Sequence, residues 1–314
     1  MYITGGIGSL PIIEGFGRDF ELDNEFSYSE TCAAIGSIYW NREMTALCSH
    51  AKYADLVERQ LYNAALVGIS QDGKKYFYRN PLESRGDLER QHWFKTACCP
   101  SNISRLWADI PELIYHETAT ALYIDQYIGS EARFSAKDVD IKIESAFPWQ
   151  GQVKISVRNR RKLTLNLRIP GWADRWEIKA NHEIVSSEYK QESKNPYTLM
   201  TQNALYKAVM LEPKEDNVIC LDLPMSILKN TADQRVKTNR SQIALSRGPI
   251  VYCLESEDEL TEAINVKDLH FEMDKIVFDE SIGVLKNNTA IFIPYFIWGN
   301  RGKRRMKVWF YAES

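Results

Sequence analysis

The sequence predicts an α+β fold with more than one domain, and three observations support that prediction. Apolar residues recur every three to four positions between residues 27 and 116, as they do on helices. From about residue 118 they recur at every second position, as they do on strands. The chain has 314 residues, which is more than a domain with a single hydrophobic core usually contains. We therefore expect a helical region followed by one or two antiparallel β-sandwich domains.

Three helices are predicted in the first region. The segments 53–68 and 103–114 each carry apolar residues at helical spacing. The segment of about 28–48 is apolar on more than one face, which is typical of a helix packed on several sides.

The third predicted helix follows a long connection. Within that connection "QDGK", residues 71–74, predicts a hairpin, and Pro81 opens a polar loop. Long connections held by a rigid frame tend to be functional. Pro100 is tolerated best at the first position of a helix, so we expect Cys99 to cap a helix that runs to about residue 116.

The second region is predicted to consist of strands separated by turns rich in Gly, Pro and Asn. A weak break falls near residue 230. We expect a helical domain over 1–117, a β-sandwich over 118–229, and a second β-sandwich or completing β-domain over 230–314. The β-rich segments are "ALYIDQYI" (121–128), "VDIKIESAF" (139–147), "GQVKISV" (151–157), "KLTLNLRIP" (162–170), "NVICLDLP" (217–224), "QIALSRGPIVYCL" (242–254) and "MKVWFYA" (306–312).

The composition argues against several classes of partner. The 39 Lys and Arg nearly balance 42 Asp and Glu, so no nucleic-acid or membrane-surface footprint is indicated. The sequence shows no basic leader with an apolar core and no run of about 18 apolar residues, and we expect a cytoplasmic protein. Six cysteines are too sparse for a disulfide framework and are expected to stay reduced.

The motif "ACCP", residues 97–100, carries two adjacent thiols, Cys98 and Cys99. Both are predicted at the start of a helix, where the helix dipole lowers the pKa of a thiol and favours the thiolate. Free cysteines are also common as inert buried residues. The motif alone therefore leaves a structural interpretation open.

A second motif, "YSETCAA", places Glu30 and Cys32 where another helix is predicted to begin. One carboxylate and three thiolates would make a tetrahedral zinc site with Cys98 and Cys99. Two observations oppose this. Residues two apart point to different sides of a regular helix, so the first turn would have to be irregular. Ser27 and Glu30 also match a capping box, which gives Glu30 a structural use.

Glu14, in "IIEGFG", is a candidate general acid. The neighbouring glycines let a backbone approach a ligand, and an apolar setting beside Ile12 and Ile13 would favour the protonated carboxyl that a general acid needs. The alternative is an ordinary loop carboxylate in solvent.

Several segments together resemble the bacterial β-L-arabinofuranosidases of glycoside hydrolase family 127, and the resemblance covers essentially the whole chain. It implies an (α/α)6 toroid followed by β-sandwich domains, and retaining hydrolysis of β-linked L-arabinofuranose or a related furanoside. The segments are "YITGGIGS" (2–9), "GFGRDFELDNEFSYSETCAAIGSIYWN" (15–41), "KYADLVERQLYNAALVGISQDGKKYFYRNPLES" (52–84), "ACCPSNISRLWA" (97–108), "LRIPGWAD" (167–174), "SRGPIVYCLE" (246–255) and "IPYFIWGNRG" (293–302).

The resemblance also implies roles for individual residues. The implied zinc ligands are Glu30, Cys32, Cys98 and Cys99. Cys98 would be the nucleophile, Glu14 would be the acid/base, and Tyr78 of "FYRNP" would contact the sugar.

Residue 1 corresponds to a point within the family's toroid, so the resemblance implies that only its last helices are present. Three helices cannot close a ring, and we expect their unpaired apolar faces to be covered by a separately encoded N-terminal half or by a second copy of the chain. Two alternatives stay open. One is a non-catalytic truncated remnant that supports assembly or carbohydrate binding, and the other is a zinc protein whose thiolates are purely structural.

We predict that the isolated chain turns over p-nitrophenyl β-L-arabinofuranoside negligibly, because the resemblance implies that part of the sugar pocket lies outside it. A chromogenic assay of the purified chain measures this. Full turnover without any added polypeptide would contradict the prediction.

Overall fold

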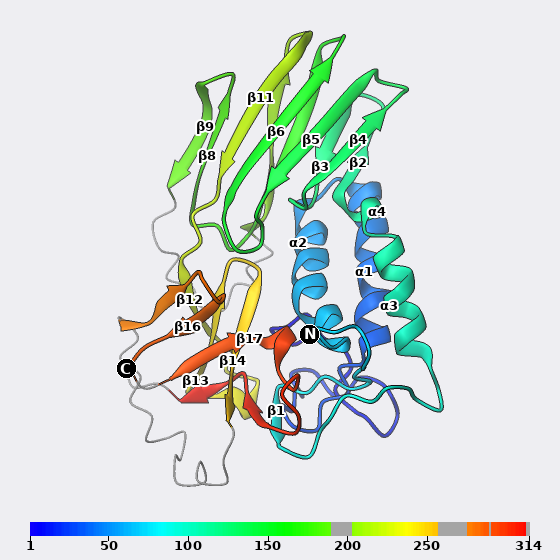
Figure 1. Cartoon of the computed structure of the whole chain (residues 1–314), viewed down its shortest axis with the longest axis vertical. Helices are drawn as coiled ribbons and strands as arrows, with labels where there is room; N and C mark the ends of the chain where they lie inside the picture. Colours follow the sequence, from blue (N-terminus) through cyan, green and yellow to red (C-terminus); the bar gives the residue numbers. More distant parts are fainter. Residues whose placement is uncertain (190–202, 257–274, 289, 312–314) are drawn as a thin grey trace. The chain divides into compact units, whose positions relative to one another are not determined.

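The computed structural model describes residues 1–189, 203–256, 275–288 and 290–311 and has a mixed α+β architecture, as predicted (Figure 1). The chain forms two compact units. The first unit comprises Met1–Ile38, Arg59–Leu106 and Ile227–Ser314, and the second comprises Tyr39–Glu58 and Trp107–Ser226. A search of the described residues for a helix both long enough and apolar enough to cross a membrane found none.

Helices form where the apolar periodicity predicts them. Helix α1 covers Thr31–Cys48. Helix α2 covers Ala51–Arg59 and continues as a π turn, Gln60–Ala65, and a 3-10 turn, Leu66–Gly68. The predicted hairpin after it is present as an isolated antiparallel bridge between Ile69 and Tyr76.

The third helix begins and ends at other residues than predicted. Helix α3 covers Cys98–Ala108, so Cys98 is its first residue and Cys99 is not a cap outside it. The prediction that it runs to about residue 116 is wrong. Pro111 lacks an amide hydrogen and its ring would clash with the carbonyl four residues earlier, so it starts a separate short helix, α4, Pro111–Ile114.

The first unit contains a nine-stranded sheet, in which β1, β18, β14, β17, β16 and β15 are successive neighbours and β13 joins β12, β14 and β19. Every pair in it is antiparallel. Its strands are β1 (Glu83–Arg85), β12 (Ile227–Thr231), β13 (Gln242–Arg247), β14 (Ile250–Ser256), β15 (Val277–Asp279), β16 (Val284–Lys286), β17 (Ile291–Pro294), β18 (Arg305–Lys307) and β19 (Phe310–Tyr311).

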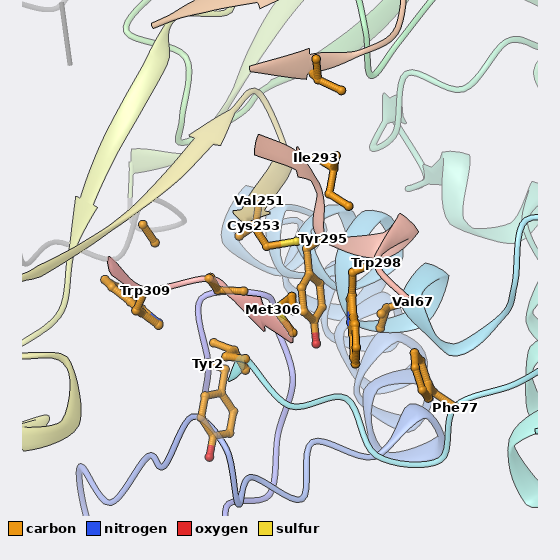
Figure 2. Packing of buried hydrophobic residues seen from close by; sticks show 14 residues of the cluster. Tyr2, Val67, Phe77, Val251, Cys253, Ile293, Tyr295, Trp298, Met306 and Trp309 are labelled. Carbon is orange, nitrogen blue, oxygen red and sulfur yellow. The ribbon is translucent and has the colours of Figure 1, made fainter. Parts of the chain in front are cut away.

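The core of the first unit packs sheet residues against the segment before β1 (Figure 2). The rings of Phe77 and Trp298 stack with centroids 4.8 Å apart. The guanidinium of Arg90 lies 4.3 Å from the centroid of the Phe77 ring and donates to the carbonyl oxygens of Val67 and Trp298. These contacts anchor Phe77 and therefore the backbone of its neighbour, Tyr78.

Hydrogen bonds extend this anchor to the start of α1. The Tyr295 hydroxyl shares its one hydrogen between the carbonyl oxygens of residues 80 and 81, which lie 2.9 and 3.0 Å away. Thr31, the first residue of α1, donates its amide to the Tyr78 carbonyl and its hydroxyl to the Phe77 carbonyl, at 3.0 and 2.9 Å. The 3-10 turn Tyr295–Ile297, which follows β17, and the adjacent Trp298 thus hold the Tyr78 segment, and that segment holds the beginning of α1.

The second unit contains two sheets with the orders β10-β7-β3-β2 and β4-β5-β6-β11-β8-β9. The period-two segments are strands, as predicted. The pairing of β3 with β7 is parallel, however, so the expectation of purely antiparallel pairing is wrong there. A parallel pair needs a long connection, which the strands of the other sheet provide. The strands are β2 (Tyr115–Glu117), β3 (Ala121–Ile124), β4 (Ser130–Phe134), β5 (Val139–Ser145), β6 (Gln152–Asn159), β7 (Leu163–Ile169), β8 (Arg175–Ala180), β9 (Glu183–Tyr189), β10 (Leu205–Leu211) and β11 (Lys214–Asp222).

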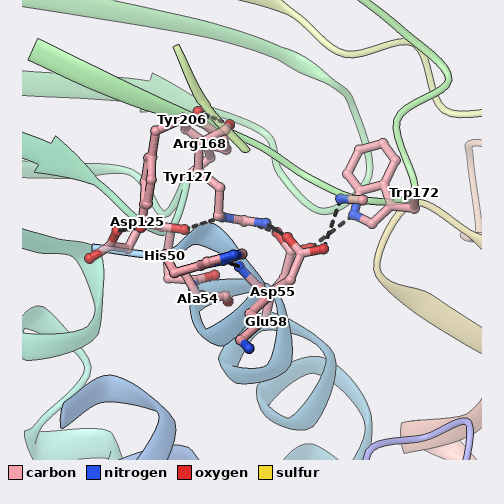
Figure 3. A network of polar contacts seen from close by, with 12 residues as sticks. His50, Ala54, Asp55, Glu58, Asp125, Tyr127, Arg168, Trp172 and Tyr206 are labelled. Atoms are coloured by element: carbon pink, nitrogen blue, oxygen red, sulfur yellow. Dashed lines mark hydrogen bonds and ion pairs between the residues drawn. The ribbon is translucent and has the colours of Figure 1, made fainter. Parts of the chain in front are cut away.

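A fully buried arginine, Arg168 of β7, organises the polar contacts of the second unit (Figure 3). Its guanidinium donates to the carboxylates of Asp55 and Glu58. Glu58 also accepts from the Trp172 indole at 2.8 Å, and Asp55 accepts from the Gly171 amide at 2.7 Å. Burial raises the pKa of Asp55 to about 7, although the nearby Arg168 opposes that shift. Two buried carboxylates therefore depend on one cation.

We predict that Arg168→Met lowers the free energy of unfolding by about 3–5 kcal/mol, because it leaves two buried carboxylates without a counter-charge. Urea denaturation measures the loss. Arg175→Met is the matched control, since Arg175 is exposed on β8 of the same unit, and it should change stability by less than about 0.5 kcal/mol. Equal effects of the two substitutions would refute this account of Arg168.

Candidate metal centre

The four side chains predicted to bind a metal lie together in the first unit. Glu30, Cys32, Cys98 and Cys99 each offer one ligand atom, and these four atoms all lie within 4.8 Å of one another. The sequence separates Cys32 from the vicinal pair by more than sixty positions. The fold therefore brings together two motifs that are distant along the chain.

Four of the six distances between these atoms are close to the edges of a tetrahedral site. The sulfur of Cys99 lies 3.6 Å from that of Cys32 and 3.9 Å from that of Cys98. Glu30 Oε1 lies 3.5 Å from the Cys98 sulfur and 3.9 Å from the Cys99 sulfur. Bonds of about 2.3 Å to sulfur and about 2.0 Å to oxygen give tetrahedral edges of roughly 3.8 Å and roughly 3.5 Å. A carboxylate with three thiolates is also a donor set that suits zinc.

The backbone around Glu30 resolves the objection to its spacing from Cys32. Glu30 precedes α1 and forms an isolated antiparallel bridge with Arg79, and Ser29 before it has a left-handed φ of 40°. Cys32 is the second residue of α1. Because Glu30 is extended and Cys32 is helical, the rule that residues two apart point to different sides of a helix does not apply.

The predicted capping box is wrong. The Ser27 hydroxyl lies 3.5 Å from the Asn24 carbonyl oxygen, to which it donates. The Glu30 carboxylate accepts a hydrogen bond from the Tyr28 hydroxyl at 2.7 Å through Oε2, while Oε1 faces the thiols. Glu30 is therefore available as a ligand.

The thiols do not ionise alike when only the protein's own groups act on them. Cys99 donates to the Cys32 sulfur, which lowers the pKa of Cys32 and raises that of Cys99. The amide of Asn102 donates to the same Cys32 sulfur at 3.2 Å and favours its thiolate. Burial raises the pKa of Cys98 to about 11, and the charge of Cys32 adds to this. The predicted lowering of the pKa of both vicinal thiols is therefore not found, because burial of Cys98 and the hydrogen bond from Cys99 to Cys32 raise the two pKa values instead.

The surroundings of Glu14 differ from the prediction. Ile12 and Ile13 are 96% and 66% exposed, so they leave Glu14 in a solvent-exposed loop instead of an apolar setting. The Tyr78 hydroxyl donates to Glu14 Oε1 at 3.1 Å. Tyr78 in turn lies close to the metal-centre carboxylate, because its hydroxyl oxygen is 3.3 Å from that of Tyr28.

Two further residues of this centre, Asn102 and Tyr28, are absent from the predicted site. Asn102 follows Cys98 and Cys99 by four and three positions, which places it on the same face of α3. That spacing could have identified it. Tyr28 lies two residues before Glu30 in an irregular segment, and its role depends on tertiary contacts that no periodicity predicts.

Comparison with known proteins shows which class of proteins this chain resembles. Family models described as the β-L-arabinofuranosidase GH127 catalytic domain, the GH127 middle domain and the glycoside hydrolase family 127 C-terminal domain match residues 1–112, 121–225 and 228–311. The chain belongs to glycoside hydrolase family 127.

Individual relatives agree with this family. A non-reducing end β-L-arabinofuranosidase of Bifidobacterium longum subsp. longum is 33% identical over an alignment of 276 residues that covers 82% of this chain and 40% of that protein. The solved structure of a GH127 β-L-arabinofuranosidase from Geobacillus stearothermophilus T6 matches all of this chain and 54% of its own chain, with 33% identity and a TM-score of 0.83. A second GH127 β-arabinofuranosidase structure shares 29% identity over the same fractions, with a TM-score of 0.81. The chain spans about half the length of these relatives or less.

We predict that the purified protein binds one zinc ion per chain through this cluster. Cys32→Ser should lower the bound metal strongly, because a hydroxyl replaces a thiolate ligand. Cobalt substitution should give a thiolate charge-transfer band in the native protein. Cys220→Ser is the control, since Cys220 is an exposed thiol of β11. A Cys32→Ser protein that binds zinc as tightly as the control would contradict the assignment.

Proposed function

We propose that this protein is a retaining glycoside hydrolase that releases β-linked L-arabinofuranose, or a related furanose, with Cys98 as nucleophile. The observation that supports this most directly is the grouping of Glu30 with three thiols, of which Cys98 is partly exposed and Cys99 is fully buried. The family and the activity named for its relatives support the same substrate class.

Zinc is the proposed cofactor, and Glu30, Cys32, Cys98 and Cys99 would hold it. When bound, a divalent cation supplies the positive charge that keeps adjacent thiols ionised at neutral pH. The fit of the donor distances to a tetrahedron supports this assignment.

Cys98 is the sulfur best placed to meet a substrate. Cys99 is 0% exposed, and the Cys32 sulfur already accepts hydrogen bonds from Cys99 and Asn102. Cys98 keeps partial exposure at the first turn of α3, so a sugar can reach it.

The proposed reaction has two displacements. In the first, the Cys98 sulfur bonds to the anomeric carbon while the bond to the leaving oxygen breaks and Glu14 gives that oxygen its proton. In the second, Glu14 takes a proton from water, the water oxygen bonds to the anomeric carbon, and the carbon–sulfur bond breaks. Two inversions at one carbon give net retention.

Tyr78 is the proposed sugar-contacting residue. Its ring is partly exposed and lies edge-on to Phe94, with ring centroids 6.1 Å apart. Its hydroxyl also donates to Glu14, so a sugar beside Tyr78 would lie close to the acid/base.

The wider setting of the activity is proposed as well. We propose an arabinofuranosyl oligosaccharide as substrate and a cytoplasmic location. No observation favours the non-catalytic remnant over the glycosidase. The alternative of a purely structural zinc site differs from the glycosidase in one respect: it predicts that Cys98 does not react with a sugar.

We predict that a slow-reacting activated β-L-arabinofuranosyl substrate, such as a 2-fluoro derivative, leaves one sugar bound covalently to Cys98. Intact mass spectrometry and peptide mapping measure this in a single turnover, so weak substrate binding does not hide it. Cys98→Ser should abolish the sulfur adduct, while Cys48→Ser, which alters an exposed thiol of α1, should keep it. Zinc-loaded protein that forms no adduct at saturating substrate would favour the structural-zinc alternative.

A further inference from the structure

Three close contacts connect Glu14 to the metal centre through two tyrosines. The Tyr78 hydroxyl donates to Glu14 Oε1 at 3.1 Å. The hydroxyl oxygens of Tyr78 and Tyr28 are 3.3 Å apart. The Tyr28 hydroxyl donates to Glu30 Oε2 at 2.7 Å. The proposed acid/base and a proposed zinc ligand are therefore the two ends of one chain of oxygen atoms.

The hydrogens along this row of oxygen atoms, from Glu14 to Glu30, can be arranged in two ways. A phenol carries one hydrogen. When Glu14 is ionised, Tyr28 donates to Glu30 and Tyr78 donates to Glu14, so no hydrogen remains for the contact between the tyrosines. That contact is the longest of the three, at 3.3 Å. When Glu14 is protonated, its own hydrogen can point to Tyr78, and Tyr78 can turn its hydrogen to the Tyr28 oxygen, so every contact has a hydrogen.

We propose that Tyr28 is a positioning residue that couples Glu14 to the metal centre. Its hydroxyl donates to Glu30, and its oxygen is a second acceptor, beside Glu14, for the hydrogen of the Tyr78 hydroxyl. The purpose of this coupling rests on the proposed function, in which Glu14 is protonated before the first displacement and ionised before the second. Rotation of one hydroxyl then gives both forms of Glu14 a hydrogen-bond partner, and no heavy atom has to move.

The packing around the two tyrosines supports a fixed arrangement. Tyr28 is only 5% exposed. A β-carbon at Gly8, which has a φ of 86°, would lie 2.8 Å from Cδ1 of the Tyr28 ring, so the Gly8 backbone packs directly on that ring. The backbone of Tyr78 is held by the amide of Thr31, which donates to its carbonyl at 3.0 Å. Both phenols are thus anchored on segments that flank Glu30.

The position of Tyr28 also divides the work of the two Glu30 oxygens. Oε2 accepts from Tyr28, whereas Oε1 lies 3.5 Å from the Cys98 sulfur. Hydrogen bonds of this kind orient a ligating carboxylate, and their loss typically weakens metal binding. Tyr28 therefore has one effect on Glu30 and another on Tyr78, and each can be measured separately.

The test of the coupling uses Glu14→Gln, because the glutamine amide can donate to Tyr78 as the protonated carboxyl would. Tyrosine labelled with carbon-13 at Cζ gives signals that Tyr28→Phe and Tyr78→Phe assign. We expect Glu14→Gln to shift the Tyr28 signal, because Tyr78 connects residue 14 to Tyr28 by hydrogen bonds. In a Tyr78→Phe background the same substitution should leave the Tyr28 signal unmoved. A Tyr28 signal that ignores Glu14→Gln, or that responds equally without the Tyr78 hydroxyl, would overturn the proposal.

A second measurement tests the hold on Glu30. Tyr28→Phe should weaken zinc binding on the order of 10-fold in a chelator competition, whereas Tyr78→Phe should leave zinc affinity unchanged. Tyr76→Phe is the matched control, since the Tyr76 hydroxyl reaches the Gly73 carbonyl at 3.4 Å. Unchanged zinc affinity in Tyr28→Phe would also overturn the proposal.

The two hypotheses fail in different ways. Neither measurement depends on turnover, and Glu14 is an exposed loop residue whose substitution spares the core. An intact response of Tyr28 together with no sugar adduct on Cys98 would refute the glycosidase but keep the coupling. A sugar adduct on Cys98 without a response of the Tyr28 signal would support the glycosidase and refute the coupling.

Discussion

The candidate metal centre depends on holding three thiols and a carboxylate within a few ångströms of one another. Burial raises the pKa of the Cys98 thiol, the hydrogen bond to Cys32 raises that of the Cys99 thiol, and repulsion from neighbouring negative groups adds to both shifts. A divalent cation would reverse these shifts. Two helix N-termini meet at this point, because Cys32 is the second residue of α1 and Cys98 is the first residue of α3. Their dipoles add positive potential where the negative charge gathers.

The turn that follows β17, Tyr295–Ile297 with Trp298 after it, supports this centre without supplying a ligand. The Phe77–Trp298 stack and the hydroxyl of Tyr295 fix the segment that leads to β1. That segment forms the bridge with Glu30 and holds Thr31 at the first turn of α1. A loss of core packing in the nine-stranded sheet would therefore reach the metal centre through backbone hydrogen bonds.

The two units manage buried charge in different ways. In the second unit Arg168 supplies the cation for Asp55 and Glu58 from the chain itself, and the indole of Trp172 completes the set of donors. At the candidate metal centre of the first unit, the hydrogen bonds that Glu30 and Cys32 accept from outside the four donors come from Tyr28 and Asn102, which are neutral. The ion pairs around Arg168 are suited to stability, whereas the cluster of Glu30 with three thiols is suited to binding an ion and to chemistry at sulfur.

The sequence by itself determined the order of helices and strands, because apolar periodicity is a local property of each segment. It also identified the four donor residues, since thiols and a carboxylate are recognisable by their chemistry and by their resemblance to a family. It did not determine that Glu30 is extended, that Ile12 and Ile13 face solvent, or that β3 and β7 run parallel. Those outcomes depend on contacts between distant segments, such as the bridge from Glu30 to Arg79. Only the tertiary structure decided that Tyr28 joins Glu30 to Tyr78, because the two tyrosines are 50 residues apart and no local pattern relates them.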